Sequence, residues 1–134
     1  MPQTNTHNHE LGRKIESLVA SLYEQKGFRL VAKNFQRYKT GTQGRQGEID
    51  LVLEKDKMLI FVEVKARLNQ KFGPSASQIT RKQLQNLFYT MQYFLLKNPS
   101  YQNYQKRFDA AFYDHPKLNI IPNAYSFDDL SSPC

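Results

Sequence analysis

Two acidic residues and a lysine interrupt apolar runs in the middle of the chain. Asp50 lies within GEIDLVL, and Glu63 and Lys65 lie within LIFVEVKAR. An ionised group in a buried strand is costly unless another group compensates it. Compensation here can come from the lysine, from a proton shared by the carboxylates, or from a divalent cation. Two carboxylates with backbone carbonyls and water form the hard oxygen site that Mg²⁺ or Mn²⁺ accepts.

The two runs have the features of a β-hairpin, because each is apolar, β-branched and of strand length, and a short polar break separates them. Side chains alternate across a strand, so a two-residue turn at Asp56-Lys57 places Asp50 opposite Glu63, with Lys65 on the same face. Like charges in that position are destabilising. The opposite face then pairs Ile49 with Val64, Leu51 with Val62, and Leu53 with Ile60.

These residues resemble a known signature. Asp50 followed by Glu63-Val64-Lys65 resembles the D…(D/E)-x-K pattern of the restriction-endonuclease-like (PD-(D/E)XK) nuclease superfamily, although Ile49 stands where the superfamily name has proline. The longer segments GEIDLV and FVEVKAR resemble the YraN-like branch of small bacterial proteins. The resemblance implies one α/β domain over residues 9–125, with a central mixed β-sheet flanked by α-helices. Residues 1–8 and 126–134 are expected to form a flexible N-terminal tail and a C-terminal tail.

The resemblance also implies a catalytic site. Asp50 and Glu63, helped by the carbonyl of Val64, are expected to bind Mg²⁺ or Mn²⁺ for phosphodiester hydrolysis. Lys65 is expected to orient the attacking water or to stabilise the transition state. In related archaeal Holliday-junction resolvases a glutamate on the first helix joins the metal site, and Glu16 matches that place; a surface acid is the alternative for this residue.

The elements that position these residues follow from hydrophobic periodicity. Apolar residues at helical spacing predict a helix from about residue 9 to 26 and a second one that ends near residue 97, capped by Ser75 or Ser77. Strands are expected over residues 28–35, 107–113 and 118–121. In the first of these strands, Phe28, Leu30 and Ala32 are expected to share one face.

Two further acids have alternative roles. Glu48, two positions before Asp50, is interpreted either as an acid that supports the metal ligands or as an exposed charge where the strand begins, and the second reading is preferred. Asp109 is expected to form a structural ion pair with Arg107 or Arg67 rather than to take part in catalysis.

The chain is basic. Nineteen lysines and arginines against twelve acidic residues give a formal net charge of +7 and a pI near 9.5, which is typical of proteins that bind polyanions. The glycine-rich segment over residues 40–47 is interpreted either as a disordered connector or as a mobile arm that closes over nucleic acid. Contacts with the DNA backbone, with little base readout, are expected from Arg37, Lys39, Arg45, Arg67 and Lys82. For Lys82 a merely solvated position is the alternative.

Together these features predict a metal-dependent endonuclease that acts on DNA. The likeness to junction resolvases suggests branched or single-stranded DNA and a homodimer. The alternatives are a nucleic-acid-binding module that has the nuclease fold and little turnover, or a scaffold in a DNA-processing complex. No apolar run is long enough to span a bilayer and the N-terminus lacks the apolar segment of a signal peptide, so we expect a cytoplasmic protein without a membrane partner.

Overall fold

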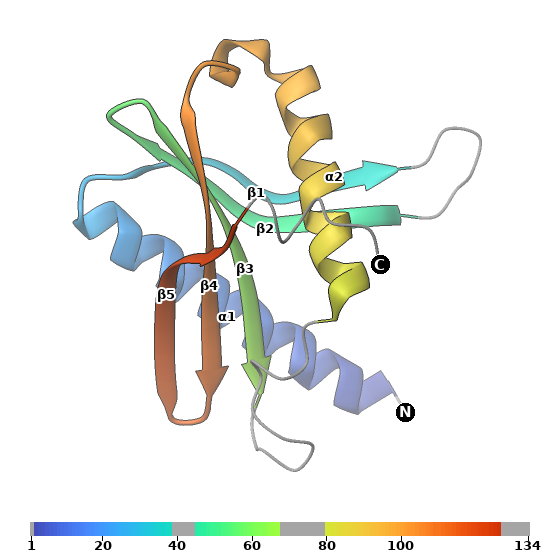
Figure 1. Cartoon of the computed structure of the whole chain (residues 1–134). Coiled ribbons are helices and arrows are strands. Elements are labelled where there is room, and N and C mark those ends of the chain that lie inside the picture. Colours follow the sequence, from blue (N-terminus) through green and yellow to red (C-terminus); the bar gives the residue numbers. More distant parts are fainter. Residues whose placement is uncertain (1, 39–44, 68–79, 127–134) are drawn as a thin grey trace.

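The computed structural model of the 134-residue chain describes residues 2–38, 45–67 and 80–126. Within these residues it contains a five-stranded sheet in the order β1-β2-β3-β4-β5 and two long helices (Figure 1). This confirms the expected α/β fold with a mixed sheet and flanking helices. The elements are α1 (Pro2–Gln25), β1 (Arg29–Tyr38), β2 (Arg45–Lys55), β3 (Met58–Arg67), α2 (Arg81–Lys97), the 3₁₀ helix η2 (Pro99–Tyr101), β4 (Gln105–Asp114) and β5 (Lys117–Tyr125).

The sheet is mixed because one neighbouring pair of strands differs from the others. β3 and β4 are parallel, whereas the three other pairs are antiparallel. A parallel pair needs a long crossover connection, and the segment that contains α2 supplies it. Figure 1 shows α1 and α2 on opposite faces of the sheet.

Each helix covers its own apolar cluster. The α1 cluster includes Ile15, Val19, Leu51, Leu53, Ile60 and Val62, and the α2 cluster includes Ile49, Val52, Phe61, Leu87, Phe94 and Phe108. β3 contributes to both clusters, which explains why LIFV is a continuous apolar run rather than an alternating one. The strand that carries the catalytic candidates is therefore held from both sides.

The expected register of the β2–β3 hairpin is confirmed from the turn as far as Leu51 and Val62, and the expected pair of Ile49 with Val64 is not formed, because these two residues pack on opposite faces of the sheet. Leu51 pairs with Val62 and Leu53 with Ile60, around a turn at Asp56 and Lys57. Both turn residues have positive φ, 51° and 65°, as the tight type I′ hairpin turn requires.

The expectation that Ile49 shares a face with Leu51 is wrong. Ile49 packs in the α2 cluster with Phe35, whereas Leu51 packs in the α1 cluster. Asn34 lies between the β1 residues that pair with these two, and its φ of 55° interrupts the regular alternation. The alternation of side chains between the two faces of the sheet is therefore broken at this position, beside Asp50.

The expectation that Phe28, Leu30 and Ala32 share one face is also wrong, because β1 contains a bulge. The register shifts between Leu30 and Ala32. Leu30 and Phe28 consequently face α1, whereas Ala32 faces α2 together with Val31. An extra residue in one strand of an antiparallel pair has this effect on alternation.

The helix boundaries differ from the expected ones. Thr80, not Ser75 or Ser77, caps α2: its hydroxyl accepts the backbone N–H of Gln83 at 3.1 Å, and the Gln83 side chain accepts the backbone N–H of Thr80 at 2.9 Å. Both serines lie outside the described residues. α1 begins at Pro2 rather than near residue 9, and proline suits a first helical turn. Neither α1 nor α2, in the described part of the chain, is long and apolar enough to cross a membrane.

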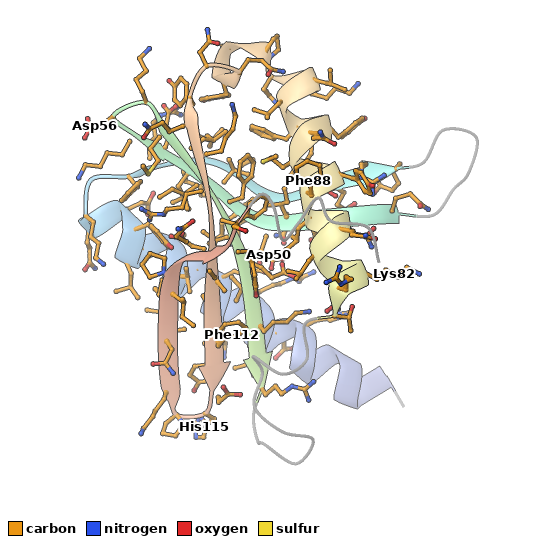
Figure 2. All side chains as sticks on the ribbon, in the orientation of Figure 1. Asp50, Asp56, Lys82, Phe88, Phe112 and His115 are labelled. Atoms are coloured by element: carbon orange, nitrogen blue, oxygen red, sulfur yellow. The ribbon has the colours of Figure 1, made fainter. Side chains whose placement is uncertain are left out.

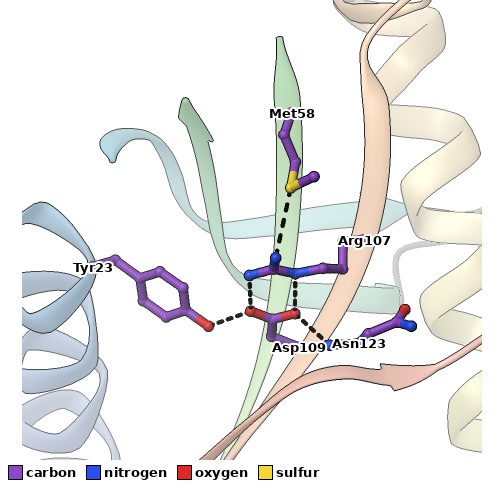
Figure 3. A network of polar contacts seen from close by, with 5 residues as sticks. All are labelled: Tyr23, Met58, Arg107, Asp109 and Asn123. Atoms are coloured by element: carbon purple, nitrogen blue, oxygen red, sulfur yellow. Dashed lines mark hydrogen bonds and ion pairs between the residues drawn. The ribbon is translucent and has the colours of Figure 1, made fainter. Parts of the chain in front are cut away.

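Asp109 forms the structural ion pair that the sequence predicts, with Arg107 as its partner (Figure 3). The guanidinium donates to both carboxylate oxygens, at 2.8 and 2.9 Å, although the Asp109 side chain is fully buried. The Tyr23 hydroxyl on α1 and the backbone N–H of Asn123 on β5 donate to the same carboxylate. The network joins α1, β4 and β5.

Gly47 allows α2 to approach β2 closely. A Cβ atom at Gly47 would lie 2.2 Å from the Thr90 hydroxyl oxygen and 3.4 Å from the backbone oxygen of Asn86. We expect Gly47→Ala to lower the free energy of unfolding by about 1–3 kcal/mol, because α2 must shift to admit the methyl group. Gly12→Ala is the matched control: no atom lies within 4 Å of a Cβ there, and alanine stabilises a helix interior by about 0.5–1 kcal/mol. Urea denaturation of both variants measures the difference, and equal stabilities would contradict the close approach.

Candidate active site

The carboxyl groups of Asp50 and Glu63 meet, as the hairpin register predicts. They are hydrogen-bonded to each other, and Asp50 Oδ2 also accepts the backbone N–H of Val64 at 2.8 Å. Asp50 is buried, with 9% of its surface exposed. The hairpin therefore places two acids in contact at the point where β2 changes face.

Lys65 compensates these acids only in part. Its Nζ lies 3.9 Å from Glu63 Oε2, a separation typical of a loose ion pair. The Lys65 side chain is 28% exposed, against 13% for Glu63. One lysine beside two carboxyl groups leaves the pair with a negative charge or a shared proton.

Burial raises the pKa of both carboxyl groups. The negative charge of Glu63 raises the pKa of Asp50 further, whereas the charge of Lys65 lowers the pKa of Glu63. In metal-free protein the pair consequently retains a proton well above the pH at which an exposed aspartate loses it.

The pair opens into a polar cleft of about 340 Å³ between the β2–β3 hairpin and α2. Asp50 lines this cleft together with residues of α2, and Figure 2 shows Lys82 on the first turn of that helix. The α2 residues Gln83 and Asn86 line the cleft and were not identified from the sequence. The only signal for them was their spacing of one helical turn beside the apolar stripe that contains Leu84 and Leu87. The full lining is Gln46, Gly47, Glu48, Asp50, Glu63, Val64, Lys65, Gln83, Asn86 and Leu87.

Glu16 on α1 reaches the same acidic cluster through Asn34. With its amide nitrogen toward the acids, Asn34 donates to Glu16 Oε1 at 3.3 Å and to Glu48 Oε2 at 3.1 Å. Burial, together with the charges of Asp50 and Glu48, raises the pKa of Glu16 to about 7. Glu48 lines the cleft and acts electrostatically on the other three acids, so the preferred reading of it as an exposed strand-entry charge is wrong.

The donor set fits a hard divalent cation that keeps several waters. Among the described residues, no three His, Cys, Asp or Glu side chains are grouped closely enough to hold a metal ion. Asp50 and Glu63 supply two carboxylates, and Mg²⁺ commonly binds proteins through one or two carboxylates with water in its other positions. The excess of acid over base in the cleft would favour a cation electrostatically.

Stability should depend on pH because of this cluster. The pKa of Glu16 is about 7 in the folded state, against an ordinary value of 4.5, and the pKa of Asp50 is raised above its ordinary value of 3.8. At a pH between the ordinary and the raised pKa of each acid, the folded state therefore binds more protons than the unfolded state. The free energy of unfolding must therefore fall as the pH rises from about 5 to 8. We expect this loss of stability to be smaller in Asp50→Asn, which removes one titrating acid and its repulsion. Urea denaturation in EDTA at pH 5, 6, 7 and 8 tests this, and parallel curves for both proteins would contradict it.

One of the predicted DNA-binding residues, Lys82, lies on α2, and another, Arg37, contacts that helix. Lys82 is exposed on its first turn. Arg37 on β1 donates through Nε to the Thr90 hydroxyl at 3.3 Å, which fixes part of its side chain against the middle of α2. Arg37 is therefore a packing residue as well as a candidate phosphate contact.

The structure describes the other three predicted DNA-binding residues, Arg67, Lys39 and Arg45, less completely. Arg67 is the last residue of β3, and its backbone carbonyl accepts the N–H of His115 at 3.1 Å. Lys39 lies outside the described residues, and only the backbone of Arg45 is described, at the start of β2. The predicted arm of residues 40–47 is described only from residue 45 onward.

Comparisons with known proteins place the chain in a bacterial group. The model of the uncharacterised protein family UPF0102 matches residues 15–112, which include Glu16, Asp50, Glu63 and Lys65. A UPF0102 protein of Acinetobacter baylyi is 36% identical over 115 residues, covering 86% of this chain and 77% of that protein. A UPF0102 protein of Francisella tularensis is 34% identical over 117 residues, covering 87% and 94%. One of Fusobacterium nucleatum is 27% identical over 124 residues, covering 92% and 98%. The chain therefore belongs to the UPF0102 family, the family that the YraN-like resemblance predicts.

Proposed function

We propose that this protein is a metal-dependent endonuclease that hydrolyses phosphodiester bonds in DNA. The observation that carries the proposal is the contact of the buried Asp50 carboxyl group with that of Glu63, which is 13% exposed, beside Lys65 in a polar cleft. Folding brings like charges together here at a cost in stability, and such costs are concentrated at functional sites. Placement in the PD-(D/E)XK superfamily, near the junction resolvases, is part of the proposal.

The residues have separate roles in this proposal. Asp50 and Glu63, with the Val64 carbonyl, hold Mg²⁺ or Mn²⁺, and the bound ion supplies Lewis acidity toward the scissile phosphate. Lys65 orients the attacking water and stabilises the negative charge that develops on the phosphate. Glu16, linked by Asn34 to Glu48, adds negative charge on the α1 side of the same cluster.

DNA binding in this proposal rests on charge rather than on base readout. The net charge of +7 favours a polyanion, and Lys82 is exposed near the cleft. Such contacts position the phosphate backbone and weaken as salt rises. Branched DNA and a homodimer with two sites remain predictions from the resemblance.

A nucleic-acid-binding module with this fold and little turnover is the second candidate. The observation that favours it is the lack, in the described residues, of a third close protein ligand of the carboxylate, imidazole or thiolate type. Lys65 then serves only to compensate Glu63, and the acids share a proton instead of a metal ion.

Thermal melts with and without metal separate the two candidates. In EDTA, Asp50→Asn should be as stable as wild type or slightly more so, because it removes a repulsion of about 0.2–1 kcal/mol and its amide oxygen can still accept the Val64 N–H. In millimolar Mn²⁺ the order should reverse, because an ion at ten times its Kd stabilises the folded wild type by about 1.4 kcal/mol. If Mn²⁺ does not shift the wild-type melt, the binding module becomes the better account. The direct test is cleavage of single-stranded, duplex and four-way-junction DNA in Mg²⁺, Mn²⁺ or EDTA.

A further inference from the structure

A second polar groove lies beside the candidate active site, between α1 and β1. It has a volume of about 400 Å³ and is lined by His9, Gly12, Arg13, Glu16, Asn34, Gln36 and Glu48. Glu48 also lines the cleft that contains Asp50 and Glu63, so the two hollows adjoin at this residue. A ligand in the groove would therefore be next to the reacting groups.

Gly12 is the feature of this groove that the fold does not explain. It lies in the interior of α1, where glycine is less favourable than alanine by about 0.5–1 kcal/mol. Glycines in helices are commonly needed where another element packs closely, yet no atom lies within 4 Å of a Cβ built at this position. The missing side chain instead keeps the wall of the groove open, which suits the close approach of a ligand to the helix backbone.

The groove carries groups that suit a nucleotide. Arg13 is exposed and offers a guanidinium, which binds phosphate through paired hydrogen bonds. Glu16 and Glu48 can accept hydrogen bonds from exocyclic amino groups of a base. Tyr38, which donates to the side chain of Gln36 and is 53% exposed, offers an aromatic surface beside the groove for base stacking.

We propose that this groove binds an unpaired nucleotide of the DNA strand that is cleaved, next to the scissile phosphate. The inference rests on the proposed nuclease function and specifies its substrate as DNA that is single-stranded or opened near the cleavage site. A volume of about 400 Å³ is that of a small-ligand site and is too small for a duplex. An unpaired base can enter such a site, whereas a paired base must first leave the helix at a cost of a few kcal/mol.

Three glutamine variants at consecutive positions of α1 test the inference. Gly12→Gln introduces a side chain into the groove, Arg13→Gln removes its cation, and Lys14→Gln removes a cation that does not line it. Binding is measured by fluorescence anisotropy in EDTA, so that no strand is cut, with a labelled single strand of about 15 nucleotides and with a blunt duplex of the same sequence. Circular dichroism melts confirm that each variant is folded, and Gly12→Gln should melt no lower than wild type.

We expect Gly12→Gln and Arg13→Gln to weaken single-strand binding by roughly fivefold, and Lys14→Gln by less than about twofold. Binding of the blunt duplex should change equally little in Gly12→Gln and Lys14→Gln. Equal effects of all three variants on the single strand, or a larger effect of Gly12→Gln on the duplex, would overturn the inference and leave the nuclease proposal in place. A wild-type protein that binds neither DNA would overturn both.

Discussion

Asp50→Asn and Lys65→Ala are each expected to lower DNA cleavage by about 100-fold or more, with DNA affinity changed by less than about threefold. Asp50→Asn removes one carboxylate from the proposed cation site but keeps an oxygen that can accept the Val64 N–H, which lies 2.8 Å from Asp50 Oδ2. Lys65→Ala removes the cation that lies 3.9 Å from Glu63 and would stabilise the transition state. In the proposed function Asp50 acts through the bound ion and Lys65 acts on the reacting phosphate, so turnover should fall while the ground-state contacts with the DNA backbone remain.

Single-turnover cleavage and binding of the same DNA measure the two effects separately. Asp56→Asn and Lys14→Ala are the matched controls, because both residues are exposed, both changes remove the same charges as the test variants, and neither residue lines the cleft. Asn is also well suited to the φ of 51° at position 56. Undiminished cleavage by both test variants would assign the activity to another site or to a contaminant.

Asp109→Ala is expected to lower the free energy of unfolding by about 3–5 kcal/mol. The substitution leaves three donors without their acceptor: the Arg107 guanidinium, the Tyr23 hydroxyl and the Asn123 N–H. The loss is large against a typical domain stability of about 5–15 kcal/mol because a partly buried cation remains unpaired. Tyr23→Phe removes a single donor and should cost about 1–3 kcal/mol.

Urea denaturation of wild type, Asp109→Ala and Tyr23→Phe measures these changes in the free energy of unfolding. Asp56→Asn is again the control, with an expected change within about 0.5 kcal/mol. Tyr23→Phe should retain cleavage activity at a temperature where it is folded, because the network holds α1 against β4 and β5 outside the cleft. If Asp109→Ala is as stable as wild type and inactive, the residue is catalytic and its structural assignment is wrong.

The sequence alone determined the local geometry of the hairpin. The turn at Asp56 and Lys57 fixes the register, and a strand repeats every two residues, so Asp50 and Glu63 had to meet and Lys65 had to follow on the same face. The ion pair of Arg107 with Asp109 was likewise predictable, because both residues lie on one face of one strand. These inferences need only neighbours along a strand or across one turn.

Only the tertiary structure decided what surrounds that pair. The reversal of face at Asn34 separates Ile49 from Leu51, and the close packing of α2 on Gly47 brings Gln83 and Asn86 to the cleft. The link from Glu16 through Asn34 to Glu48 joins residues of α1, β1 and β2. Such contacts depend on where bulges and left-handed residues redirect side chains, and on how closely a helix can approach a strand. Those features are settled by packing between distant segments, which local periodicity does not record.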